Sequence, residues 1–415
     1  MSVSAASSRI AKSARRLCAI AGVLSIAALC ACTTAPAPAP LPPPVPVQPP
    51  APHQISAEQP EFLRLPNLAP GKTPVRVGII LPFSDSSANI RALANSMLKA
   101  AELALYDSGN RDILLMTSDD TGSPADATAA AQTMLDQGAE LIIGPLFSAS
   151  VAAIAPLARD HGVPVLAFST DRTVAGNGIY LLSFQPQNEV QRIVAYAVSQ
   201  GHQNFAALIP QTAYGDVVAQ SFRDSVTAAG AKVIDVERFN PSAGAVMDPA
   251  AALAKSNADA IFIPQGGALL RGIAPTLSYD GIDNTKVKYL GTGLWDDPAN
   301  TREPLLSGGW FAAPQPSANQ AFVDKYRQTF GTEPPQLAAL AYDAVSLAAL
   351  LSPGTPYHRF TLPALIDANG FSGVNGIFRF RADGSIDRGL AVLAVDPNGF
   401  TVVSPAPTTF QSSGS

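Results

Sequence analysis

The chain has 415 residues, of which 47% are apolar, and its formal net charge is −5. The first 31 residues carry four basic side chains and no acidic one, so the rest of the chain has 23 basic and 32 acidic residues. This length fits two globular lobes with non-globular extensions. A mildly acidic chain without a basic stripe excludes nucleic-acid binding as its main role.

The N-terminal segment has the pattern of a targeting sequence. Lys12, Arg15 and Arg16 precede an uncharged apolar run from Leu17 to Leu29. That run is too short to span a bilayer, which takes roughly 20 residues, but it suits the apolar region of a signal peptide. We therefore expect residues 1–31 to be a signal peptide.

The apolar run ends in the sequence Leu29-Cys30-Ala31-Cys32, which resembles a bacterial lipobox with Cys32 as the lipidated residue. One alternative is lipidation of Cys30, which would place the bulky Leu29 at the cleavage position; the other is an ordinary cleaved signal. By resemblance to lipoprotein sorting, the absence of Asp at Thr33 favours the outer membrane. No cysteine lies beyond Cys32, so we expect neither disulfides nor thiol chemistry in the folded region.

A proline-rich linker over 32–73 follows the cysteine. Ten of the 17 residues in 36–52 are proline, which excludes helices and sheet ladders and favours extended polyproline II. Such a stretch is a semi-rigid stalk of roughly 50 Å; the alternative is plain disorder. We expect 53–73 to continue this spacer, the globular domain to cover 74–403, and 404–415 to be a disordered tail.

Within 74–403, apolar β-branched runs alternate with segments of helical spacing. This alternation with short turns predicts an α/β fold in two lobes, each a parallel sheet flanked by helices. It pauses at 171–188, and Asp383-Gly384 predicts a hairpin turn near the C-terminal end. The expected strands are 75–82, 112–120, 139–145, 163–169, 204–210, 232–239, 259–264 and 287–292, and the expected helices are 89–107, 124–137, 149–160, 189–200, 214–229, 247–256, 267–280, 317–330 and 336–351.

Catalytic and metal-binding patterns are absent from the sequence. The four histidines are scattered, and none has metal-ligand spacing. The adjacent carboxylates Asp119 and Asp120 lie at a strand end and point to opposite sides, unlike a glycosidase pair. We expect a protein that is not an enzyme and has neither catalytic residues, nor a metal, nor a cofactor.

The stretch from Ser118 to Asp171 resembles the first lobe of type I periplasmic binding proteins of the leucine/isoleucine/valine-binding group. The residues that match are Asp119-Asp120, Ile142-Ile143-Gly144-Pro145, the strand GVPVLAFS, Tyr214-Gly215, Gly373-x-x-Gly376 and Asp383-Gly384. The resemblance implies two lobes joined by three chain crossings. Lobe 1 would comprise about 75–187 and 316–372, and lobe 2 about 188–315 and 373–403.

Two stretches, 174–184 (VAGNGIYLLSF) and 289–297 (YLGTGLWDD), with Ser169-Thr170-Asp171, look more like the penicillin-binding-protein activator lipoproteins, which share this fold. This resemblance implies a membrane-anchored periplasmic lipoprotein whose partner is a peptidoglycan synthase, a penicillin-binding protein. The alternative is a substrate-binding lipoprotein that delivers amino acids or similar small polar solutes to an ABC permease.

The fold resemblance also implies a ligand site where strands end and helices begin. The implied ligand-binding residues are Ser148, Ser169, Thr170, Thr173, Tyr214 and Gln265. Each has an alternative role: Ser148 as a helix N-cap, the residues of 169–173 in turn hydrogen bonds, Tyr214 as cover for apolar surface, and the glycines after Gln265 as a turn.

The sequence departs from amino-acid-binding relatives at one point. Those relatives have an acidic residue after the strand that matches Leu290-Gly291, where it pairs with the ligand ammonium, but this chain continues Thr292-Gly293-Leu294. Burying an ammonium group without a partner costs several kcal/mol. Asp171, Asp296 or Asp297 could substitute, although adjacent aspartates are commonly a solvated loop pair.

Overall fold

The computed structural model describes residues 62–68, 71–241 and 245–410. The expected signal peptide, Cys32 and the proline-rich stretch 36–52 lie outside the described residues. None of the helices in the described ranges is both long enough and apolar enough to cross a bilayer.

The first sheet has six strands in the order β1-β3-β2-β4-β5-β6. All neighbouring strands are parallel except β1 and β3, which are antiparallel. The central strands are nearly continuous apolar runs because helices cover both faces of the sheet. The strands are β1 (Phe62–Leu63), β2 (Val75–Leu81), β3 (Ile113–Asp119), β4 (Leu141–Ile143), β5 (Val165–Ala167) and β6 (Ile179–Leu181).

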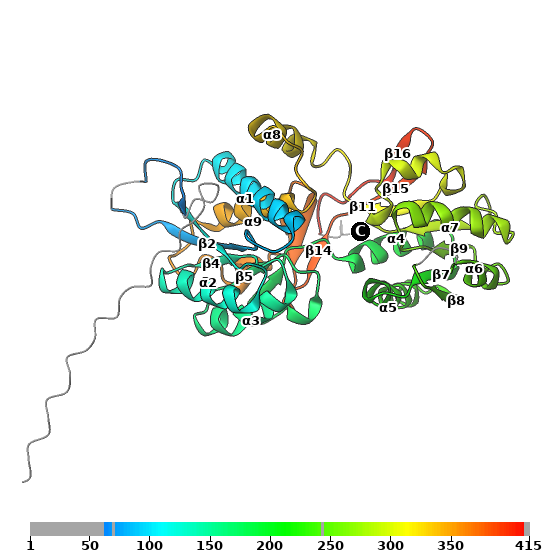
Figure 1. Cartoon of the computed structure of the whole chain (residues 1–415), viewed down its shortest axis with the longest axis horizontal. Coiled ribbons are helices and arrows are strands. Elements are labelled where there is room, and N and C mark those ends of the chain that lie inside the picture. Colours follow the sequence, from blue (N-terminus) through cyan, green and yellow to red (C-terminus); the bar gives the residue numbers. More distant parts are fainter. Residues whose placement is uncertain (1–61, 69–70, 242–244, 411–415) are drawn as a thin grey trace, which may run out of the picture. The chain divides into compact units, whose positions relative to one another are not determined.

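Helices cover both faces of this sheet. α1 (Ala88–Ser108) and α9 (Ala338–Leu351) lie side by side and share one core cluster with the sheet (Figure 1). α2 (Pro124–Asp136) and α3 (Ser148–Asp160) form a second cluster on the opposite face. α8 (Gln320–Phe330) packs through Phe322 and Tyr326 against residues of α1 and α9.

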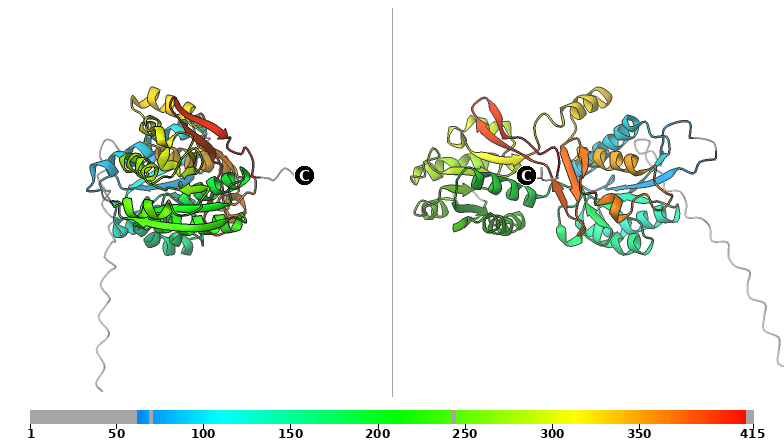
Figure 2. Two further views of the ribbon diagram at one scale, coloured as in Figure 1. Left: turned by 90° about the vertical axis from the view of Figure 1, so that its right-hand side faces the viewer. Right: turned by 180° about the vertical axis from the view of Figure 1, so that it is seen from behind.

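The second sheet has seven strands in the order β16-β15-β11-β10-β9-β7-β8. At one edge of this sheet, β15 and β16 form an antiparallel hairpin (red in Figure 2). Its strands are β7 (Asn204–Pro210), β8 (Lys232–Phe239), β9 (Ala260–Phe262), β10 (Lys288–Gly291), β11 (Trp310–Ala313), β15 (Ala391–Asp396) and β16 (Gly399–Ser404). The helices are α4 (Pro186–Ser199) and α5 (Ala213–Ala228) on one face, and α6 (Met247–Leu253) and α7 (Gly267–Tyr279) on the other. The predicted α/β fold with two parallel sheets flanked by helices is confirmed.

The border between the lobes lies later in the chain than predicted, because a small antiparallel sheet belongs to the first lobe. It contains β12 (Phe371–Gly373), β13 (Gly376–Phe380) and β14 (Ile386–Arg388), and the predicted turn at Asp383-Gly384 joins the last two. Phe371, Phe378, Phe380 and Ile386 all belong to the core of the first lobe, whereas Leu390 belongs to that of the second. The last crossing therefore lies near 388–390, and the expected border at 373 is wrong because this sheet packs its aromatic face into the first core.

Both ends of the domain extend beyond the expected limits. β1 lies inside the segment expected to be spacer, and Leu65 is buried in the first core. At the other end, the guanidinium of Arg379 lies 4.6 Å from the ring centre of Phe410. The tail expected to be disordered from residue 404 is therefore packed against the domain as far as Phe410.

We predict that Gly384→Ala destabilises the first lobe. Gly384 has φ +78°, and a Cβ there would lie 2.1 Å from the carbonyl oxygen of Ile179 on β6. We expect a loss of roughly 3 kcal/mol in the free energy of unfolding, measured by urea denaturation. Gly281→Ala is the control, since Gly281 has φ +94° and open space around it; it should lose only about 1 kcal/mol. Equal losses of unfolding free energy in the two variants would show that the β13–β14 turn is not in close contact with β6.

Candidate functional site

The second lobe gathers polar side chains where β10 ends. The phenol oxygen of Tyr214, in the first turn of α5, lies 3.0 Å from the hydroxyl of Thr292. The next residue, Gly293, donates its backbone N–H to Oε2 of Glu189 at 2.9 Å. The start of α4 thus supplies the carboxylate of Glu189, and the start of α5 supplies the hydroxyl of Tyr214. Together with the Thr292 hydroxyl at the end of β10, these groups lie at one edge of the sheet.

Burial sets the protonation of this cluster. It raises the pKa of Glu189 to about 7, although the hydrogen bond from Gly293 opposes the shift. Burial also raises the pKa of Tyr214 above its usual range, and the neighbouring Glu189 adds to that effect. At neutral pH the phenol stays protonated, while Glu189 is divided between its acid and its carboxylate form.

Gln265 lies beside this cluster. It follows β9, and its side-chain amide donates to the carbonyl oxygen of Gly266. A Cβ on Gly266 would lie 2.6 Å from the carbonyl oxygen of Leu294, so the loop after β9 touches the loop after β10. The structure therefore brings Tyr214 and Gln265 to the same edge, next to Thr292 and Gly293.

The other four candidate residues lie at the matching edge of the first sheet. Ser148 is the first residue of α3, whose N-cap is Phe147, so Ser148 does not cap the helix and its hydroxyl is only partly covered. Ser169 is buried and accepts the N–H of Asp171 at 3.1 Å. The Thr173 hydroxyl also bonds Asp171, at 2.7 Å, and Thr170 is exposed. Ser148 and Thr170 therefore keep hydroxyls available to a ligand, and Ser169 and Thr173 make turn hydrogen bonds.

Two of the three acids considered as substitutes for the missing acidic residue, Asp171 and Asp297, have other roles. Asp171 holds the 169–173 turn. Asp297 pairs with Arg271 at 3.3 Å and accepts the N–H of Ala299, whereas Asp296 is exposed. Sequence reasoning missed Glu189, because an acid in the first turn of a helix normally needs no explanation beyond the helix dipole.

A buried arginine and a buried aspartate lie where the connections between the lobes run. Arg388, at the end of β14, donates from Nε to the carbonyl oxygen of Ser183 at 3.0 Å and lies over the ring of Phe184. Asp343 on α9 accepts the N–H of Val374 at 2.8 Å. Burial raises the pKa of Asp343 to about 6, and Arg388 opposes that shift. Arg388 thereby joins the first and last crossings of the chain.

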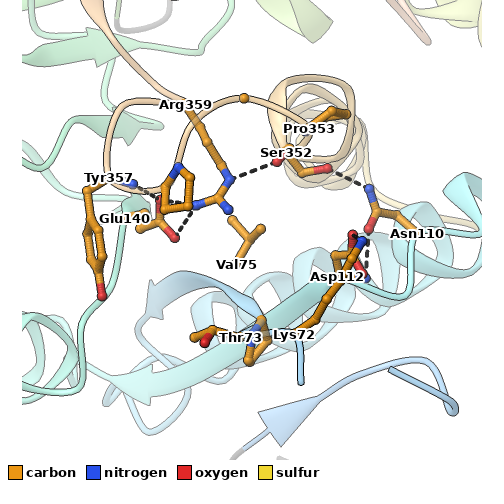
Figure 3. Close-up of a pocket in the computed structure, with 13 residues that line it drawn as sticks. Lys72, Thr73, Val75, Asn110, Asp112, Glu140, Ser352, Pro353, Tyr357 and Arg359 are labelled. Carbon is orange, nitrogen blue, oxygen red and sulfur yellow. Dashed lines mark hydrogen bonds and ion pairs between the residues drawn. The ribbon is translucent and has the colours of Figure 1, made fainter. Parts of the chain in front are cut away.

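A cavity of about 550 Å³ lies at the opposite, amino-terminal edge of the first sheet (Figure 3). Its polar side chains pair with one another. Arg359 contacts Glu140 and donates to the carbonyl oxygen of Ser352, and Lys72 pairs with Asp112 at 2.9 Å. These groups satisfy each other and hold the 352–359 loop against the sheet, so this cavity is a weaker candidate than the strand-end cluster.

Within the described ranges, no group of three or more His, Cys, Asp or Glu side chains could hold a metal ion. In the strand-end cluster, the Glu189 carboxylate accepts the N–H of Gly293, and the Tyr214 and Thr292 hydroxyls bond each other. What this arrangement can do chemically is bind a small polar group.

A family model for periplasmic binding proteins matches residues 74–400. The chain belongs to this family. The Leu/Ile/Val-binding protein BraC3 of Rhizobium johnstonii is 20% identical over 52% of this chain and 64% of its own length. A protein of Rickettsia prowazekii is 21% identical over 45% of the chain and 49% of its own length. The chain thus spans about half to just under two thirds of these curated relatives.

Solved structures share the fold of this periplasmic binding protein. A Rhodospirillum rubrum structure assigned to a branched-chain amino acid ABC transporter has a TM-score of 0.72 and 21% identity, and it covers 80% of this chain and 100% of its own. The fold predicted from the resemblance is therefore confirmed at the level of the family.

We predict that Glu189→Gln removes a pH-dependent loss of stability. The folded-state pKa of about 7 lies above the ordinary value of 4.5, so the contribution of the protonated side chain is complete below about pH 4.5 and is lost as the pH rises through 7. Gln keeps an oxygen for the Gly293 N–H and cannot ionise. The urea midpoint of the variant should exceed that of the wild type more at pH 8 than at pH 5. The same difference at both pH values would contradict the assignment.

Proposed function

We propose that this chain is a non-catalytic binding protein that takes up a small polar solute at the carboxyl edges of its two sheets. The observation that carries this proposal is the cluster of Glu189, Tyr214 and Thr292, where a carboxylate and two hydroxyls gather at a strand end. Ser148 and Thr170 offer hydroxyls at the corresponding edge of the first sheet.

The relatives support a solute of this kind. The Rhizobium relative is named for binding Leu, Ile and Val, and a Burkholderia xenovorans structure with a TM-score of 0.65 is a periplasmic ligand-binding protein of a branched-chain amino acid ABC transporter. By this proposal the chain works in the periplasm and delivers amino acids or similar polar solutes to an ABC permease.

A second candidate function is activation of a peptidoglycan synthase of the penicillin-binding-protein class. The stretches that resemble the activator lipoproteins, 169–184 and 289–297, contain Ser169 and Thr170 at the first edge and Thr292 and Gly293 at the second. We infer that these two stretches contribute to the candidate site. A stiff stalk over 36–52 would also suit a tether that reaches across the cell wall.

Both functions are compatible with a lipid anchor on Cys32, which we propose holds the chain at the outer membrane.

We predict that solute binding depends on the carboxyl edge of the first sheet. Calorimetric titration of the full chain with free amino acids should give saturable binding, and Ser148→Tyr should weaken it at least about tenfold by filling the site. Thr133→Tyr, at an exposed position of α2 in the same lobe, should bind as the wild type does. If no solute binds and the chain instead raises glycan polymerisation by a class A synthase of the same organism, the activator function replaces this one.

We predict that Cys32→Ser abolishes incorporation of radioactive palmitate in cells, because the lipobox places the modified thiol there. Cys30→Ser is the matched control and should keep full labelling. Loss of label in the Cys30 variant alone would move the anchor to Cys30.

A further inference from the structure

The carboxylate of Glu189 occupies the space that a side chain at position 293 would need. A Cβ on Gly293 would lie 3.0 Å from Oε1 and 3.4 Å from Cδ of Glu189. The backbone N–H of Gly293 meanwhile holds Oε2 at 2.9 Å. Glycine at this position therefore lets an acid from the start of α4 reach the end of β10, where the strand's own sequence supplies none.

One oxygen of this carboxylate remains available. Oε2 accepts the bond from Gly293, while Oε1 makes no hydrogen bond within the described ranges. Among the residues that the structure describes, no cationic side chain stabilises the ionised form, and the hydrogen bond from Gly293 is the one contact that lowers the pKa of Glu189. A partly buried carboxylate without a counterion is costly in the empty protein and can be stabilised by a cation that arrives from outside.

A second acceptor lies near Glu189, because the carboxylate is near enough to Tyr214 to raise the pKa of its phenol. The hydroxyls of Tyr214 and Thr292 form one hydrogen bond with each other at 3.0 Å. Thr292 is fully buried, whereas Tyr214 is partly exposed, so the phenol oxygen is the one with a lone pair that a ligand can reach. A carboxylate oxygen and a phenol oxygen at the starts of two helices match a group that donates more than one hydrogen bond and carries positive charge. A primary ammonium, with three N–H donors, has this chemistry.

We propose that Glu189 binds the primary ammonium group of the solute, with Tyr214 as a further acceptor and Thr292 holding the phenol in place. This inference rests on the proposed solute-binding function and names the chemical class of the ligand. The ammonium partner that the 290–294 stretch lacks is then supplied by a different element of the fold, the first turn of α4.

The proposal requires a proton to leave the protein. Near pH 7 a fraction of the molecules has a protonated Glu189. An incoming ammonium binds the ionised carboxylate, so the proton of that fraction passes to the buffer. Affinity for an amine should consequently rise between pH 6 and pH 8, whereas a solute without an amine should release no proton from this residue.

The test titrates the full chain, purified in detergent, with paired probes at pH 7. L-leucine, L-alanine and L-glutamate are the amine probes, and 4-methylpentanoate, propionate and glutarate are their amine-free counterparts. Each titration is run in phosphate and in MOPS, whose ionisation enthalpies differ, so the calorimeter reports released protons. We expect binding by at least one amine probe with proton release, and binding at least about tenfold weaker by its counterpart.

Two variants assign the effect to Glu189. Glu189→Gln should weaken amine binding at least about tenfold and abolish the proton release. Glu303→Gln is the matched control in the same lobe, since the Glu303 carboxylate likewise accepts a backbone N–H, from Leu305 at 3.1 Å, and it should behave as the wild type does. Circular dichroism of each variant confirms that the lobe is folded.

The outcomes separate the two proposals. Binding of amine-free probes alone, or amine binding that Glu189→Gln leaves unchanged, overturns the role of Glu189 and leaves the solute-binding function standing. Binding of no probe in either set overturns both the ligand class and the proposed function.

Discussion

A parallel strand that is buried on both faces has room for polar chemistry only where it ends. β2, β4, β7 and β9 are almost entirely buried, so their side chains serve the two cores alone. The polar groups that remain lie in the loops after these strands, and helix starts contribute N–H groups and side chains to the same edges. This constraint places Ser148, Ser169, Tyr214 and Glu189 where they are, whatever the ligand turns out to be.

The second feature that unites the molecule is the buried guanidinium of Arg388. It joins the connection at Ser183 to the last crossing and lies against two aromatic rings, of Phe184 and Phe378. Both of its terminal nitrogens, and Oδ2 of Asp343, lack a hydrogen-bond partner. Within the described residues the two side chains form no salt bridge, so Arg388 acts through its bond to Ser183 and its contacts with the two rings. We interpret these contacts as fixing which segments run together between the lobes.

Much of the fold could be predicted from sequence because local patterns of residues determine its strands, helices and turns. Continuous apolar runs such as 75–82 and 204–210 indicated buried parallel strands, and Asp383-Gly384 indicated a hairpin turn. The lobe to which that hairpin belongs could not be predicted, because it depends on which of the two cores Phe378 and Phe380 pack into. β1 was missed since two residues give no periodic pattern, and they form a strand only by pairing with β3.

The site was predicted only in part for a related reason. A resemblance carries over only positions that match a motif, so it proposed Tyr214 and the hydroxyls at the carboxyl edge of the first sheet as candidates. It cannot identify Glu189, which is more than 100 residues away from Gly293 in the chain. The stretch after β10 contains no acid at the expected position, but only the structure shows that Glu189 brings a carboxylate to this strand end.

Hydrogen–deuterium exchange of the full chain, with and without the small-molecule extract of its own periplasm, tests the central claim most directly. If the strand-end edges bind the solute, the extract will slow exchange in 145–149, 168–173, 213–216 and 290–296 together, including the Gly293 amide. Protection confined to the 72–76 and 352–359 segments would place the ligand in the cavity at the opposite edge and contradict the account.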